Sequence, residues 1–185
     1  MKGFIREELR FSLCGLNCAL CSMHLGGCCP GCGGGEGNQS CAIARCSLEH
    51  GGLQFCWDCP DYPCPNYRGF DEADSFVPHG QRRQDIAQTQ ELGMEAYLAG
   101  IEEKRSILAA LLTGYNDGRR KSFFTTAVYL LPLEELRSVT AVLDSRPELA
   151  EQPVKERAQT ATRLLQEAAD RLGISLKLNK KPKGG

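Results

Sequence analysis

Cysteine is the residue type of this chain best suited to chemistry. All 11 cysteines of the 185-residue sequence fall between Cys14 and Cys64. In a reducing compartment such a cluster holds metal more readily than disulfides, and an odd number fits a disulfide framework poorly. We therefore predict a zinc-binding segment with two ions. The predicted ligands are Cys14, Cys18, Cys21, Cys29, Cys32, Cys41, Cys46, Cys56, Cys59 and Cys64.

Pairs of cysteines separated by two residues give the clearest metal signal. Zinc takes four ligands in a tetrahedron, and one such pair supplies two of them from a single tight turn. The pairs are Cys18/Cys21, Cys29/Cys32 and Cys56/Cys59. The first two pairs together predict one four-ligand site, for which Cys14 and Cys28 are alternative ligands.

The second predicted site draws on the remaining cysteines. Any four of these five could enclose an ion: Cys41, Cys46, Cys56, Cys59 and Cys64. A crossed arrangement, in which each site takes ligands from both sets, also stays open. His24 and His50 lie among the cysteines. We interpret them as surface residues, although either could replace a sulfur ligand.

Closed zinc sites do no chemistry. An ion held by four thiolates has no open coordination position and contributes folding energy instead. Because no catalytic grouping accompanies the cysteines, we favour structural zinc in a binding or adaptor protein over an enzyme. Two alternatives stay open. One is an iron–sulfur or thiol-based redox or sensor protein, and the other is a metal-dependent enzyme with an open zinc site.

One cysteine run matches a known iron–sulfur signature. Cys14-x3-Cys18-x2-Cys21 has the spacing found in radical S-adenosylmethionine enzymes. Those enzymes need a βα barrel, whereas the residues after the cysteines follow a helical pattern. A ferredoxin-type run also fails, because His24 stands where a third cysteine is required. These two motifs are therefore disfavoured.

The charge of the cysteine-rich segment argues against nucleic acid as a partner. Residues 1–70 carry 5 basic and 6 acidic side chains. Each tetrathiolate zinc site would add a charge of −2, whereas nucleic-acid binding needs a basic surface. We therefore favour a protein partner. No apolar run reaches the roughly 18 residues of a membrane span, and no signal-peptide pattern opens the chain, so we expect no membrane partner and a cytoplasmic location.

Composition predicts a mainly α fold: a small loop-rich zinc module followed by a helical bundle of four or five helices. The predicted divisions are a cysteine-rich module at 1–70, a linker at 71–80, a helical domain at 81–176 and a basic flexible tail at 177–185. Short strand pairs are expected only around the metal loops, for instance at Arg10–Leu13.

Glycine, proline and polar residues predict where the helices begin and end. Gly93 and Gly100 are candidates to divide the helical stretch 81–112, and Asn116-Asp117-Gly118 predicts a turn. Ser122 is expected to cap the next helix, and Pro132 to occupy the first position of the one after it. The last helix is expected to run to Leu172 and to stop at Gly173.

The cysteine-rich segment resembles a known family. The blocks Leu13–Cys21, Cys29–Cys32, Cys41–Cys46 and Cys56–Cys64 resemble the prokaryotic cysteine-rich family called domain of unknown function 3795, over about residues 10–70. The resemblance implies metal-bound cysteines at the matching positions and no particular activity. The chain departs from the family pattern in a shorter gap after Cys21 and in the extra thiol of Cys28, which fits the pattern least well.

Overall fold

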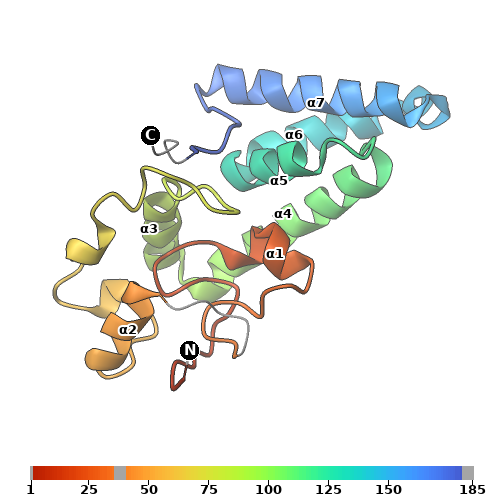
Figure 1. Ribbon diagram of the computed structural model, residues 1–185. Coiled ribbons are helices and arrows are strands. Elements are labelled where there is room, and N and C mark those ends of the chain that lie inside the picture. The colour runs from red at the N-terminus through yellow and green to blue at the C-terminus, as the bar shows by residue number, and fades with distance from the viewer. Residues whose placement is uncertain (1, 36–40, 181–185) are drawn as a thin grey trace, which may run out of the picture. The chain divides into compact units, whose positions relative to one another are not determined.

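The computed structural model describes residues 2–35 and 41–180, and it confirms a mainly α fold (Figure 1). Within those ranges the α-helices are α1 (Ser22–Leu25), α2 (Ala42–Glu49), α3 (Arg82–Leu92), α4 (Met94–Gly114), α5 (Lys121–Leu130), α6 (Leu133–Asp144) and α7 (Val154–Arg171). Short 3-10 helices are η1 (Cys18–Leu20), η2 (Cys56–Asp58), η3 (Pro65–Tyr67) and η4 (Pro147–Glu151).

No strand forms in the part of the chain that the structure describes. The strand pair expected near Arg10–Leu13 is reduced to a single antiparallel bridge between Phe11 and Asn17. The reason is that neighbouring backbone groups close tight turns instead: Leu16 O accepts from Ser12 N at 2.8 Å, and Ser12 O accepts from Gly15 N at 3.0 Å. Turns leave no extended partner for a ladder.

The chain forms two compact units. The first unit comprises the described residues of Met1–Met94 and Leu178–Gly185, and the second comprises Glu95–Lys177. The boundary therefore lies after α3, whereas composition places it before residue 81. Of the predicted tail, residues 181–185 lie outside the described residues, and Asn179 N donates to Asp74 Oδ2 at 2.7 Å within the first unit.

The core of the first unit is small and partly made of cysteine. One cluster of its buried apolar residues consists of Phe4, Leu13, Ile43, Ala44 and Tyr67, and the unit also buries Phe11, Ala19, Leu20, Val77 and Ile86. Packed against that cluster are Cys14, Cys32, Cys56, Tyr62, Cys64 and Phe70. So few apolar side chains give little stabilisation from burial, and units of this kind generally need metal or disulfides in addition.

Helix α3 closes over the cysteine-rich loops of the first unit. Gly15 has φ +93°, and a Cβ there would stand 2.5 Å from Ile86 Cδ1 on α3. Arg82, at the start of α3, donates to both carboxylate oxygens of Asp71 at 2.7 and 3.0 Å. The stretch 71–80, predicted as a linker, is therefore packed, and Val77 within it is buried.

The second unit consists of α4 to α7 around an apolar core. Helix α7 lies along α5 and α6 (Figure 1). The side chains that are fully buried between these helices include Phe124, Leu131, Leu136 and Leu165. They recur at helical spacing, which is why amphipathic patterning alone predicts this half. No helix in the described ranges is both long and apolar enough to cross a bilayer.

The helix ends agree with the sequence predictions in part. Gly93 separates α3 from α4 with φ +82°, and Gly173 follows α7 with φ +66°, both as expected for glycine. Gly100 lies inside α4 instead of ending a helix. Helix α5 begins at Lys121, so Ser122 is not its cap. Pro132 is the N-cap of α6, one position earlier than expected.

Candidate metal centres

Four cysteines line one small cavity in the first unit. Cys46 comes from α2, Cys56 and Cys59 come from the two ends of the η2 turn, and Cys64 directly precedes η3. The cavity measures about 20 Å³. That volume is close to the space occupied by one bound water, so a single metal ion would fit. We call this group the four-cysteine cavity.

Tight turns position the thiols of this cavity. Cys59 N donates to Cys56 O at 3.1 Å, and Cys56 N donates to Leu13 O at 2.9 Å, which ties the turn to the first cysteine-rich loop. Burial raises the pKa of the Cys56 thiol to about 12, and the Tyr67 hydroxyl opposes that rise. The thiols of Cys14, Cys64 and Cys46 raise it further.

The cysteines nearer the N-terminus form a second group. Burial raises the pKa of the Cys14 thiol to about 11, and the thiols of Cys32 and Cys41 add to that rise. Burial also raises the pKa of Cys18, with contributions from Cys32, Cys14 and Cys21. We call Cys14, Cys18, Cys21, Cys32 and Cys41 the N-terminal thiol group. Cys41, which spacing places with the later cysteines, thus affects the thiols of Cys14 and Cys32, as in the crossed arrangement that the sequence leaves open.

Two other cysteines stand at the edge of the N-terminal thiol group. Cys29 is half-buried, and its carbonyl oxygen lies 3.0 Å from His24 Nδ1. Cys28 is exposed, and its thiol contacts Gly26 O at 3.7 Å.

The thiols are gathered but not closed into tetrahedra. Four sulfurs 2.3 Å from one zinc ion lie roughly 3.8 Å apart. Among the described residues, no three cysteine thiols lie within 4.8 Å of one another. A change of cysteine rotamer moves its sulfur by roughly 3 Å, so closing such a site requires at least that the thiols rotate.

The surroundings of Arg6 indicate whether the N-terminal thiol group fits a metal. Its side chain is only 4% exposed and donates to the carbonyl oxygens of Gln54, Phe11 and Cys32 at 2.7, 2.9 and 3.0 Å. Among the described residues it makes no ion pair, and its Nη2 has no hydrogen-bond partner. Buried charges in proteins are normally paired.

The Cys32 thiol stands beside this guanidinium. Burial raises the pKa of Cys32, and the Arg6 charge opposes that rise. A metal-bound thiolate at Cys32 would supply both the missing negative charge and an acceptor sulfur. The residues present therefore fit a metal–thiolate centre.

The surroundings of Tyr67 likewise fit a metal–thiolate centre at the four-cysteine cavity. Its side chain lines the cavity, and its hydroxyl lies beside the Cys56 thiol, toward which it acts as a hydrogen-bond donor. Burial raises the pKa of Tyr67, and the neighbouring Cys56 raises it further, so the group is a neutral O–H donor at pH 7. A thiolate sulfur is a better acceptor for this proton than a neutral thiol is.

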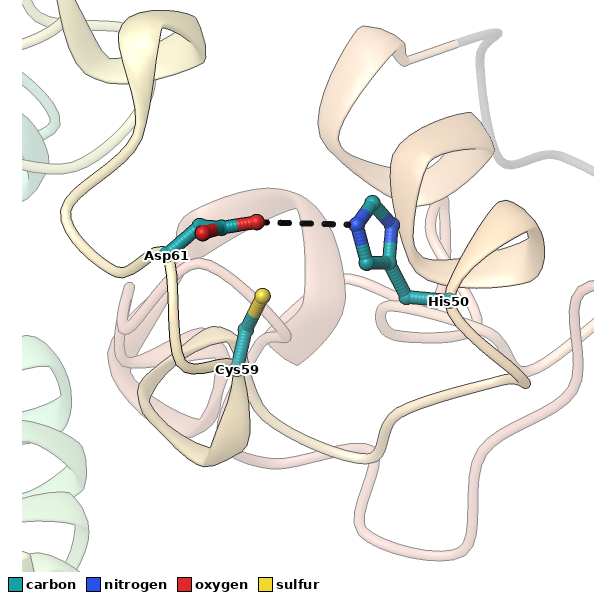
Figure 2. A group of neighbouring side chains, drawn as sticks. All are labelled: His50, Cys59 and Asp61. Atoms are coloured by element: carbon teal, nitrogen blue, oxygen red, sulfur yellow. Dashed lines mark ion pairs between the residues drawn. The ribbon is translucent and has the colours of Figure 1, made fainter.

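Sequence reasoning missed one group of possible ligands. His50, Cys59 and Asp61 each place a ligand atom within 4.8 Å of the other two (Figure 2). His50 is the C-cap residue after α2, four residues after Cys46, and Asp61 stands two residues after Cys59. The sequence signal was therefore present as a histidine and an aspartate, each close in sequence to a predicted cysteine ligand.

Comparison with known proteins adds no relative. No protein-family model, no curated protein and no solved structure matches this chain. The resemblance of the cysteine blocks to domain of unknown function 3795 therefore stays a prediction.

Proposed function

We propose that the first unit is a structural zinc module with two ions, and that the chain is a non-catalytic binding or adaptor protein. The observation that supports the proposal most strongly is the four-cysteine cavity, because cysteines from three neighbouring segments line one space of about 20 Å³. Zinc bound there would supply folding free energy. The buried donors of Arg6 and Tyr67 support the same conclusion.

The chemistry of the donor set favours zinc with no open position. One ion would be held by Cys46, Cys56, Cys59 and Cys64. The other would be held by four cysteines drawn from Cys29 and the N-terminal thiol group. Four thiolates around zinc exclude substrate, so a role in binding is favoured over catalysis. The negative charge of such sites favours a protein partner over nucleic acid. Cysteines that bind metal instead of forming disulfides also favour a reducing compartment, and therefore a cytoplasmic location.

Metal analysis of the purified full-length protein tests this proposal. We expect two zinc atoms per chain by plasma mass spectrometry, and one in the variant Cys56→Ser/Cys59→Ser. The matched control Cys28→Ser removes an exposed thiol outside the four-cysteine cavity and should keep both. Iron with sulfide and a visible absorption band would instead support the redox or sensor alternative.

Circular dichroism of the same samples gives a second readout. Strong chelation should abolish the folded signal of the first unit while the helices of the second unit, α4 to α7, stay folded. The reason is that the core of the second unit contains no cysteine. Unchanged near-ultraviolet dichroism after complete removal of metal would refute a structural role.

A further inference from the structure

His50 is oriented as a metal ligand on the surface of the first unit. Its Nδ1 lies 2.8 Å from the carbonyl oxygen of Cys46. A carbonyl oxygen can only accept, so Nδ1 carries the proton and donates. In the neutral imidazole the lone pair is therefore on Nε2. A carbonyl partner that fixes the tautomer and the ring in this way is the usual outer contact of a metal-bound histidine.

The lone pair of His50 faces two further ligand atoms. His50 Nε2 lies 3.9 Å from Asp61 Oδ2 (Figure 2). The Cys59 sulfur points toward the space between these two side chains, and all three ligand atoms lie within 4.8 Å of one another. Nitrogen, oxygen and sulfur are the three donor types that zinc accepts. Three protein ligands leave a fourth position for water.

This group differs from the four-cysteine cavity in its access to solvent. The side chains of His50 and Asp61 are 42% and 72% exposed. The two sites nevertheless share Cys59, and His50 also lines the cavity and places Nδ1 3.7 Å from the Cys46 sulfur. An ion bound by His50, Cys59 and Asp61 would thus already hold one of the four cysteines of the cavity.

We propose that His50, Cys59 and Asp61 form an exposed entry site through which zinc exchanges with the four-cysteine cavity, an inference that rests on the proposed function. Cys59 stays bound as a bridging thiolate throughout. The resident ion first leaves to solvent through the same three ligands; His50 and Asp61 then release the incoming ion, with the water at its fourth position, as the sulfurs of Cys46, Cys56 and Cys64 take it. One divalent ion enters and one leaves, so charge and protons balance. Weaker imidazole and carboxylate donors outside, and thiolates inside, direct the ion inward.

The rate of zinc exchange tests this site on the metal-loaded full-length protein. Isotopically enriched zinc is added to the purified protein, and its incorporation is followed by native mass spectrometry. We expect His50→Ala and Asp61→Ala each to slow exchange at the four-cysteine cavity by about tenfold or more, the scale on which metal sites respond to loss of a partner. Zinc content should stay at the wild-type value in both variants.

His24→Ala is the matched control. His24 also lies in the cysteine-rich segment and also has Nδ1 near a cysteine carbonyl, at 3.0 Å from Cys29 O. It belongs to no group of three ligand atoms within 4.8 Å among the described residues. Its removal should leave the exchange rate unchanged.

Three results would overturn the entry site. Wild-type exchange rates in His50→Ala and Asp61→Ala would show that the ion takes another path. Loss of one zinc from His50→Ala would make His50 a resident ligand. Equal slowing in His24→Ala would indicate a general effect on the first unit. A wild-type protein that contains no zinc would instead refute the proposed function itself, and the metal analysis shows this before any exchange is measured.

Discussion

Arg82 should be the most sensitive charged residue of the first unit. Its side chain is 1% exposed, and it donates to both oxygens of Asp71 and, at 3.1 Å, to the hydroxyl of Tyr62. Its guanidinium also lies 4.4 Å from the ring centre of Tyr67. Replacing Arg82 with alanine removes all of these contacts and leaves the Asp71 carboxylate without its buried partner.

The size of the loss follows from burial. Breaking a buried ion pair by removing one partner costs about 3–5 kcal/mol. Asp71 is 23% exposed and can regain some water, so we expect the lower end, about 3 kcal/mol, for Arg82→Ala. Arg83 contacts the same carboxylate at 3.1 Å but is 74% exposed. An exposed pair contributes about 0–1 kcal/mol, so Arg83→Ala is the matched control.

Urea denaturation of the metal-loaded protein measures the difference. Trp57 is the only tryptophan and lies in η2, so its fluorescence reports on the first unit. With a urea slope of about 1–3 kcal/mol/M, Arg82→Ala should lower the midpoint by about 1–3 M, and Arg83→Ala should change it little. Arg82→Lys should lie between them, because lysine keeps the charge but cannot bind both oxygens. Equal effects of the Arg82 and Arg83 substitutions would refute the reasoning.

Two further perturbations test the packing of the first unit. By the same fluorescence measurement, Gly15→Ala should destabilise the first unit by more than Gly51→Ala. Both glycines have positive φ, which costs another residue about 1–2 kcal/mol. Only at Gly15 would the new Cβ also meet Ile86, at 2.5 Å. Tyr67 has a pKa raised above its ordinary value of 10.0 by burial and by Cys56, so its contribution to stability is complete below pH 10 and is lost as the pH rises further. Wild type should therefore lose stability relative to Tyr67→Phe above pH 10, and parallel pH profiles would contradict this.

The helical half was predictable because its signals are local. Apolar residues at three- and four-residue steps, with glycine or proline between them, are enough to predict α4 to α7. The errors are at helix ends, where a single contact decides which residue begins or ends the helix. Asn116 Oδ1 accepts from the backbone N–H groups of Gly118 and Arg120 at 3.1 and 3.2 Å. These bonds fix the turn before α5, which begins at Lys121, so Ser122 lies inside the helix.

The cysteine-rich half was predictable in its local turns but not in the packing of its loops. Spacing identifies which cysteines share a turn, because that depends on neighbouring residues alone. Whether Cys41 joins the earlier or the later thiols depends on how separate loops pack. The boundary after α3 was missed for the same reason. Its determinants, the contact of Gly15 with Ile86 and the ion pair of Arg82 with Asp71, join segments far apart in sequence.

Comparison of the two buried arginines connects the packing of the first unit to its proposed metal. Arg82 and Arg6 are both almost fully buried, at 1% and 4% exposed. Arg82 has the carboxylate of Asp71 as a direct partner, whereas Arg6 donates to carbonyl oxygens and lies near the face of Phe55 and the Cys32 thiol, and the Glu8 carboxylate senses its charge without forming an ion pair with it among the described residues. A guanidinium keeps its charge at any pH at which the protein folds, so a buried one needs a compensating anion. Metal-bound thiolates would provide that anion beside Arg6 but are not needed beside Arg82. The contacts of Arg6 should therefore depend on bound metal, while those of Arg82 depend on Asp71.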